Sequence, residues 1–270
     1  PYAREIDAPY RYDPRLGQYG VETADIVPKS VVVPDLGDEP GHIDLPDGAF
    51  IYEAGVKSLT KLNPHVPESI RGTVAALGHP AVVEHLQKIG ADAIELMPVT
   101  AWIDERHLRD LGLTNAWGYN PVTFMAPDPR LCPGGIAELR EAVAALHKAG
   151  IAVILDLVFN HSGESDQFGG TLSFRGLDNA TYYRLAEDDP SVFINDTGCG
   201  NTIACDHPMV RRYIIDSLRF FVTQAGIDGF RFDLAPILGR TRQGFDTHAE
   251  TLDAILSDPA LKGRTMIAEP

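Results

Sequence analysis

Three short apolar runs each end in charged residues: VILDLVFNH at 153–161, IDGFRFD at 227–233 and MIAEP at 266–270. Each run is apolar on both alternating faces, which is typical of a strand buried in a parallel sheet. A charge inside such a strand costs several kcal/mol unless it is paired or used. The exceptions to the apolar pattern therefore indicate one polar pocket at the carboxyl ends of parallel strands. They are Asp156, His161, Arg231, Asp233 and Glu269.

A unit made of an amphipathic helix, a glycine and a buried strand recurs along the chain. The helical segments 82–90, 136–150 and 207–226 end in Gly90, Gly150 and Gly226, where a helix C-cap favours a left-handed residue. A further helix near 248–256 precedes the last strand. This alternation predicts an α/β protein with a parallel sheet and helical crossovers. The predicted strands are 51–57, 92–97, 151–158, 228–233 and 265–269.

Two architectures fit five parallel strands, a doubly wound open sheet and part of a (β/α)8 TIM barrel. No glycine-rich phosphate turn follows the first strand, which weakens the nucleotide-binding alternative. A complete barrel takes about 250 residues. We therefore interpret residues 51–270 as a catalytic barrel truncated after about the fifth strand.

Two segments lie outside this repeating pattern. Residues 162–206, between the third and fourth strands, are too many for an ordinary loop and predict an inserted subdomain. Residues 1–50 are rich in Pro, Gly and Asp, with one strand candidate at 30–33. They predict an N-terminal extension wrapped on the barrel.

The composition restricts the partners. The 270 residues carry a formal net charge of −15, which disfavours nucleic acid and anionic membrane surfaces and is compatible with a neutral sugar. No apolar stretch reaches the roughly 18 residues of a spanning helix, and the N-terminus lacks a signal-peptide pattern, so a cytoplasmic location is the default. Three cysteines do not form a disulfide framework. Isolated thiols are favoured over a bridge or metal site at Cys199 and Cys205.

The strand ends can perform glycoside chemistry. Side chains alternate along a strand, so Arg231 and Asp233 point inward while Phe230 and Phe232 face the helices. Because neighbouring strands lie about 4.8 Å apart, Asp233 and Glu269 can approach the roughly 5–5.5 Å spacing of a retaining glycosidase. Asp233, held ionised by Arg231, suits the nucleophile, and Glu269 suits the acid.

The other polar and aromatic residues suit substrate binding. Asp156, His161 and Arg231 would bind hydroxyls and developing charge, and Trp117 and Tyr119 offer aromatic faces for a sugar ring. Each residue alone also fits a structural role as an ion pair, a cap or a packing residue. Their occurrence together at successive strand ends favours a site.

These segments resemble three conserved regions of the α-amylase superfamily of glycoside hydrolases. DLVFNH, GFRFDLA and AEP occur in the family's order, with an insert after the first. The resemblance implies that Asp233 is the nucleophile and Glu269 the acid/base. It also implies that the subsite of the attacked glucose is lined by Arg231, Asp156, His161 and Tyr119.

A finer resemblance, to bacterial glycogen debranching enzymes of the isoamylase type, covers the whole chain. It is carried by PYAREI, VPKSVVV, YEAGVKSLTKLNPHVPESIRGT, WGYNPVTFMAPDPR and TGCGNT. It implies hydrolysis of α-1,6 branches in glycogen or limit dextrin, with retention and without an organic cofactor. An α-1,4-acting amylase or glucanotransferase and a non-catalytic glycan-binding fragment are the alternatives.

Several family features differ or fall outside this chain. A fourth conserved region, a His-Asp pair, does not occur in it, and residues 1–50 are expected to follow a β-sandwich glycan-binding domain. We therefore expect the isolated chain to be inactive. Gly55 and Ser58 stand where relatives often have His and Gly. Some relatives bind calcium near the position of Asn160, and a metal is left unassigned.

Overall fold

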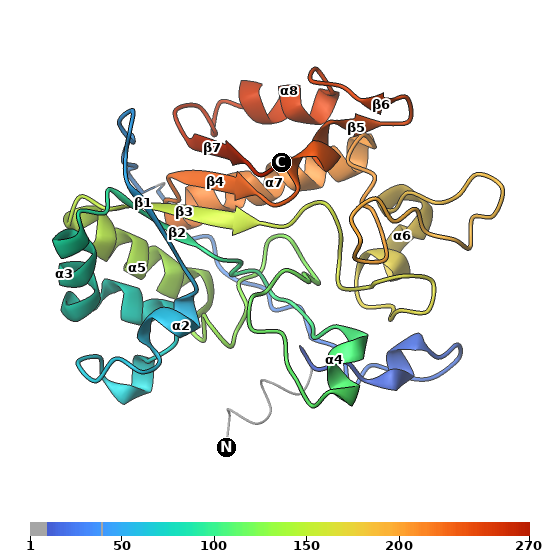
Figure 1. The fold of residues 1–270 in the computed structure, drawn as a ribbon, viewed down its shortest axis with the longest axis horizontal. Coiled ribbons are helices and arrows are strands. Elements are labelled where there is room, and N and C mark those ends of the chain that lie inside the picture. Colours follow the sequence, from blue (N-terminus) through green and yellow to red (C-terminus); the bar gives the residue numbers. More distant parts are fainter. Residues whose placement is uncertain (1–9, 39) are drawn as a thin grey trace.

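A computed structural model describes residues 10–38 and 40–270, and the PYAREI segment lies outside this range. Five parallel strands form one sheet, and their spatial order follows the chain (Figure 1). A doubly wound sheet would reverse direction at a switch point, whereas consecutive strands of a (β/α) barrel follow each other in this way. The sheet is therefore an arc of such a barrel, as the sequence predicts. Its strands are β1 (Ile51–Ala54), β2 (Ala93–Leu96), β3 (Ala152–Leu157), β4 (Gly229–Phe232) and β7 (Thr265–Ala268).

Helices connect the strands. The longer crossover helices are α3 (Pro80–Ile89), α5 (Gly135–Lys148) and α7 (Pro208–Ala225), and α8 (Glu250–Ser257) precedes β7. Gly90, Gly150 and Gly226 have φ values of 77°, 76° and 76°, so the predicted left-handed helix ends are confirmed. The remaining elements are α2 (Val56–Thr60), α4 (Arg106–Asp110), α6 (Phe174–Tyr182), the antiparallel pair β5 (Arg240–Thr241) and β6 (Gly244–Phe245), and short 3-10 turns. Within the described ranges, no helix combines the length and apolarity that crossing a membrane requires.

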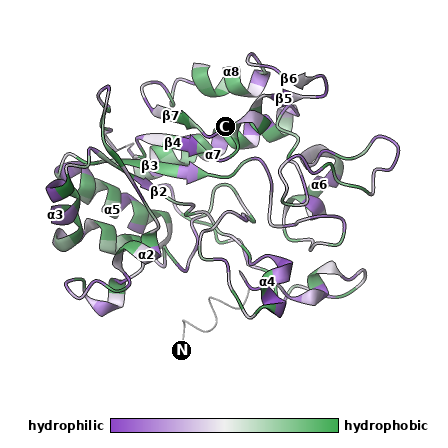
Figure 2. Ribbon diagram, viewed as in Figure 1, coloured by the Kyte–Doolittle hydropathy of each residue, from purple (hydrophilic) through white to green (hydrophobic). Residues whose placement is uncertain are grey.

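Alternation along the strands separates a hydrophobic outer face from a polar inner face. Phe230 and Phe232 of β4 are buried in the main hydrophobic core, which also contains Leu146 of α5 and Phe221 of α7. Hydrophobic residues accordingly predominate along β3 and on the helices that cover the sheet (Figure 2). The predicted orientation of both phenylalanines toward the helices is confirmed, and Arg231 between them lies on the inner face.

The amino-terminal part of the inner face is closed by a segment of the predicted extension. Ile43 and Leu45 pack against Ala152 and Ile154. The backbone N–H of Ile43 donates to the buried carboxylate of Asp228 at 2.7 Å. This end of the sheet is therefore apolar and filled, and the open polar space lies at the carboxyl ends of the strands.

Two strand predictions were wrong in whole or in part. The first strand ends at Ala54 rather than residue 57, because α2 begins at Val56. Residues 30–33 form no strand, and Val31 and Val32 are exposed. Their β-branched side chains favour extended backbone, but proline flanks the run at 28 and 34, and no partner strand pairs with it.

Residues 162–206 contain α6 and two isolated antiparallel bridges, Tyr183 with Ile203 and Leu185 with Phe193. Figure 1 places this segment beyond the carboxyl end of β3. Glu164 anchors it, because its buried carboxylate accepts backbone N–H bonds from Leu172, Ser173 and Arg175 at 2.6–2.9 Å. The segment is therefore ordered around a buried carboxylate next to the polar end of the sheet.

Candidate active site

Charged residues line the inner face at the carboxyl ends of four strands. Glu53 of β1 is the register partner of Glu95 of β2, and Asp156 of β3 is the register partner of Arg231 of β4. Glu95 and Asp156 are buried. One guanidinium thus lies among several carboxyl groups, and its contacts decide the electrostatics of the site.

Arg231 directs each of its three side-chain nitrogens at a carboxylate from a different strand. Its Nη1 contacts Asp156, its Nη2 lies 2.6 Å from Glu269 Oε1, and its Nε lies 3.7 Å from Glu95 Oε1. Arg231 therefore links β2, β3 and the end of β7 to its own strand.

The expectation that Arg231 holds Asp233 ionised is wrong. Burial raises the pKa of Asp233, and the neighbouring Glu269 carboxyl raises it further, while Asn160 and Arg231 act in the opposite direction. The Arg231 guanidinium pairs instead with Asp156, Glu269 and Glu95. Asp233 is thus a partly buried carboxyl group whose pKa is raised.

Asn160 makes the direct contacts to Asp233. Its side-chain N–H group donates to the backbone carbonyl of Asp233 at 2.8 Å and to Asp233 Oδ2 at 2.6 Å. The residue after Asp233, Leu234, has a φ of 45°, a left-handed conformation that costs a non-glycine residue free energy. The chain therefore turns sharply after Asp233.

Glu269 lies beside Asp233, as the strand order predicts. The Glu269 carboxyl group lies near enough to raise the pKa of Asp233. Glu269 Oε2 accepts from the backbone N–H of Leu234 at 3.2 Å, and the Glu269 carbonyl accepts from Ala235 at 2.9 Å. These bonds fix the strand ends that carry the two carboxyl groups.

Tyr119 and His161 complete the cluster. The Tyr119 hydroxyl donates to Asp156 Oδ2 at 2.5 Å. Burial raises the pKa of Asp156 to about 7, and it also raises the pKa of Tyr119. Burial lowers the pKa of His161 to about 4, and its ring nitrogens face Asn160 Oδ1 at 2.5 Å and the Tyr119 carbonyl at 3.0 Å. The side chains form one connected network from Tyr119 to Asp233.

Trp117 is the one predicted site residue that lies outside this network. Its side chain is 69% exposed, and it borders a cavity together with Tyr119. The six other predicted residues are brought together.

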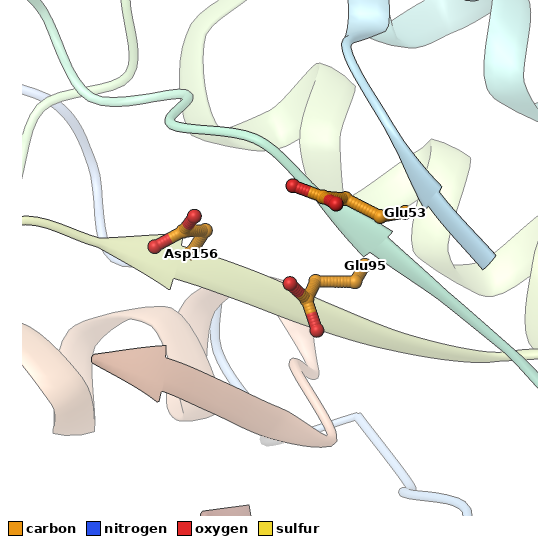
Figure 3. A group of neighbouring side chains, drawn as sticks. All are labelled: Glu53, Glu95 and Asp156. Atoms are coloured by element: carbon orange, nitrogen blue, oxygen red, sulfur yellow. The ribbon is translucent and has the colours of Figure 1, made fainter. Parts of the chain in front are cut away.

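Glu53, Glu95 and Asn160 were not singled out as site residues by sequence reasoning. Figure 3 shows the side chains of Glu53, Glu95 and Asp156 gathered on neighbouring strands, and one carboxylate oxygen of each lies within 4.8 Å of the others. Arg231 contacts two of the three, so a positive charge already lies beside this group. The signal for Glu95 was available, since it interrupts the apolar run AIELMPV as Asp156 interrupts its own strand.

Asn160 lies near where some relatives bind calcium, and Cys199 and Cys205 were considered for a bridge or a metal site. Both polar atoms of the Asn160 side chain are directed at protein partners, Asp233 and His161. All three cysteines are free, including Cys199 and Cys205. The residues near the reaction centre are thus organised by hydrogen bonds and ion pairs.

Comparison with known proteins agrees with this geometry. Residues 79–198 match the sequence family of the α-amylase catalytic domain. This match agrees with the resemblance of the chain's motifs to the α-amylase superfamily. It is 47% identical over its whole length to a glycogen debranching enzyme of Yersinia enterocolitica and 45% identical to one of Yersinia pseudotuberculosis. The chain spans 42% of the length of these two curated relatives.

Solved pullulanase structures resemble the fold. A pullulanase from Anoxybacillus sp. LM18-11, complexed with maltotriose, superposes on 87% of this chain and 34% of its own with a TM-score of 0.66 and 28% identity. A pullulanase from Paenibacillus barengoltzii, complexed with maltohexaose and α-cyclodextrin, covers 83% of this chain and 35% of its own with a TM-score of 0.63 and 27% identity.

Proposed function

We propose that the protein containing this chain hydrolyses α-1,6-glucosidic branch linkages of glycogen or limit dextrin, with retention at the attacked carbon. The observation that carries this proposal is the position of the Asp233 and Glu269 carboxyl groups beside each other at the ends of neighbouring strands, where Glu269 raises the pKa of Asp233. Retaining glycosidases use two carboxyl groups about 5–5.5 Å apart. The names of the relatives, glycogen debranching enzyme and pullulanase, support the choice of linkage.

In the proposed reaction, the Asp233 carboxylate attacks the anomeric carbon while Glu269 donates its proton to the departing glycosidic oxygen. A covalent glycosyl ester forms on Asp233 as the glycosidic bond breaks. Glu269 then removes a proton from a water molecule, which attacks the ester and releases Asp233.

The surrounding residues have positioning and binding roles in this proposal. Asn160 orients the Asp233 carboxylate through its amide. Arg231 holds Glu269 and Asp156, and Tyr119 is fixed by its bond to Asp156. We assign Asp156, His161, Tyr119 and Trp117 to binding of the sugar. Their hydrogen-bonding groups and aromatic faces suit a neutral carbohydrate.

The remaining parts of the proposal concern cofactor and location. Carboxyl groups and water suffice for this chemistry, so no organic cofactor is included. The free cysteines fit a reducing compartment such as the cytoplasm. The net charge of −15 disfavours nucleic acid and anionic membranes as partners.

The proposal is tested by incubating the full-length protein with amylopectin, with phosphorylase limit dextrin and with linear maltodextrin. We expect linear maltooligosaccharides to be released from both branched substrates and little cleavage of the linear one. Asp233→Asn and Glu269→Gln should each abolish this release. Cleavage of linear maltodextrin alone would assign the protein to the α-1,4-acting enzymes, and binding without cleavage to the non-catalytic class.

A further inference from the structure

Asn201 is a buried polar side chain outside the reaction centre, near the carboxyl end of the inserted segment 162–206. It is 0% exposed. Its Nδ2 donates to the backbone carbonyls of Ser162 at 2.9 Å and of Ser165 at 2.8 Å. Its Oδ1 accepts from the backbone N–H of Ser162 at 3.0 Å. The whole carboxamide is therefore bonded to the stretch of backbone just after Asn160.

The same part of the inserted segment also holds the backbone of Asn160 itself. The backbone N–H of Ile203 donates to the Asn160 carbonyl at 2.9 Å. The Cys205 thiol donates to the carbonyl of the preceding residue, Phe159, at 3.7 Å. All four of these residues are buried. The carboxyl end of the inserted segment therefore runs along the backbone on which Asn160 lies.

The loop that carries Tyr119 gives this stretch of backbone a second support. The Gly163 N–H donates to the Pro121 carbonyl at 2.7 Å. A Cβ atom at Gly163 would lie 2.8 Å from the Asn120 carbonyl oxygen, so the two backbones are in contact. The stretch is therefore held by two separate supports, the Tyr119 loop and the inserted segment.

The contact made by Asn201 imposes special backbone conformations. Gly200, which precedes Asn201, has a φ of 105°, and a Cβ atom there would lie 2.6 Å from the Asp166 backbone nitrogen. Glycine is therefore required at this close approach. Ser165, whose carbonyl accepts from Asn201, has a φ of 58°, which costs a non-glycine residue free energy. Asn201 thus helps to hold Ser165 in a strained conformation.

We propose that Asn201 is a positioning residue for catalysis: by fixing the backbone beyond Asn160, it keeps the amide of that residue directed at the Asp233 carboxylate. The inference rests on the proposed hydrolysis and gives the inserted segment a part in it. Asn160 donates to Asp233 Oδ2 at 2.6 Å, and hydrogen bonds weaken steeply when they are poorly aligned. A small displacement of the Asn160 backbone therefore misdirects the carboxylate that attacks the sugar. A merely structural Asn201 would affect the melting temperature and not the turnover of the folded enzyme.

The test is steady-state kinetics of full-length Asn201→Ala on phosphorylase limit dextrin across a range of pH. We expect kcat to fall about tenfold and KM to change less, because a weakened hydrogen bond to a charged group costs about this factor. Burial raises the pKa of Asp233 and the Asn160 amide lowers it, so the acidic limb of the kcat/KM profile should move to higher pH by about 0.5–1 unit. The variant leaves in place the ionisable groups that interact with Asp233, which include Glu269, Arg231, Asp156 and Cys199.

The same substitution in an Asn160→Ala background tests whether Asn201 acts through Asn160. There it should lower kcat less than about twofold, because the amide that it positions is already absent. The matched control is Thr202→Ala. Thr202 is also 0% exposed, but its hydroxyl accepts from the Asp196 backbone N–H at 2.9 Å, within the inserted segment. Thr202→Ala should lower the melting temperature and leave kcat and the pH profile like those of the wild type.

An unchanged kcat and pH profile in Asn201→Ala, or an equal fall in kcat in the Asn160→Ala background, would overturn the positioning role. If thermal unfolding shows that Asn201→Ala does not fold, the smaller change Asn201→Ser, which keeps a hydroxyl, is measured in the same way. Failure of the wild type to cleave any branched glucan would instead refute the proposed hydrolysis. In that case, 13C NMR titration of Asp233, assigned with Asp233→Asn, still decides the inference, since Asn201→Ala should raise the pKa of Asp233 by about 0.5–1 unit.

Discussion

Asn160 holds Asp233 at two points, donating to the Asp233 carbonyl at 2.8 Å and to its carboxylate at 2.6 Å. The Asn160 oxygen in turn faces His161 Nδ1 at 2.5 Å, and His161 Nε2 faces the Tyr119 carbonyl at 3.0 Å. Asn160, in the loop that follows β3, therefore fixes the orientation of the Asp233 carboxyl group. This connection couples the proposed nucleophile to the loop that carries Tyr119, a residue we assign to sugar binding.

Replacing Asn160 with alanine should lower kcat about 10–100-fold and change KM less, because a hydrogen bond to a charged group contributes about 1.5–3 kcal/mol. The reason is that the Asp233 carboxylate loses its donor while the sugar-binding groups remain. Steady-state kinetics on limit dextrin measures both constants. Asn63→Ala is the control, since the Asn63 side chain lies outside the site and accepts a bond from the His65 backbone N–H at 3.0 Å. A variant with normal kcat and raised KM would assign Asn160 to substrate binding instead.

Replacing Arg231 with lysine should reduce kcat/KM about 100-fold or more and lower the melting temperature. A lysine has one cationic nitrogen, whereas Arg231 addresses Asp156, Glu269 and Glu95 with three. Carboxyl groups then remain buried without a partner, which is costly. Activity assays and thermal unfolding measure the two effects. The control is Arg212→Lys, because the Arg212 side chain is 74% exposed and pairs with Asp216 on the same helix at 3.5 Å. Near-normal activity of the lysine variant would show that one positive charge suffices.

The positions of four site residues were predictable, because Asp156 and Arg231 interrupt buried strands while Asp233 and Glu269 follow the ends of β4 and β7. The ion-pair partner of Arg231 was not predictable from the sequence. Residues two apart on one strand are about 6.6 Å apart, whereas cross-strand neighbours are about 4.8 Å apart. Arg231 therefore reaches Asp156, its register partner, rather than Asp233. Glu95 lies two strands away, on β2, and comes within 3.7 Å of Arg231 only because the arginine side chain is long. Such contacts depend on side-chain torsions that the sequence does not specify.

The strand predicted at residues 30–33 was wrong for a different reason. Three valines in succession favour extended backbone, but a strand also needs a neighbour with which to pair its backbone groups. The spatial order of the sheet leaves no place for residues 30–33 within it. Local propensity therefore predicted strands correctly only between the helices of the repeated unit, because there each strand has a neighbouring strand with which to pair.

The buried Asp156 should make stability depend on pH. Its pKa is raised from 3.8 to about 7, mainly by burial. Between these values the folded protein holds a proton that the unfolded chain has lost. The stabilisation is thus fully present below about pH 4 and is lost as the pH rises through 7.

Urea unfolding of wild type and Asp156→Asn at pH 5 and pH 8 isolates this effect from other titrating groups. From pH 5 to pH 8, the wild type should lose about 1–3 kcal/mol of unfolding free energy relative to the variant. His161, whose pKa is lowered to about 4, contributes with the opposite sign below pH 6.5 in both proteins. A wild type that gains stability relative to the variant as the pH rises would show that Arg231 keeps Asp156 ionised.

Gly229 controls the approach of the two strands that carry Asp233 and Glu269. It is the register partner of Thr265, and an added Cβ would lie 2.6 Å from the Thr265 carbonyl oxygen and 2.8 Å from its Cβ. Gly229→Ala must therefore separate β4 from β7 locally. We expect a loss of about 1–3 kcal/mol in unfolding free energy. Because separation also displaces the two carboxyl groups, kcat should fall as well.

Chemical denaturation and limit-dextrin kinetics of Gly229→Ala measure these two losses. Gly41→Ala is the matched control, since its new methyl group meets no atom within 4 Å. Reduced stability with full activity would show that the carboxyl pair tolerates movement of β7. Wild-type values for both would show that the two backbones can separate at this position without cost, and the close strand contact would then have no part in placing Asp233 against Glu269.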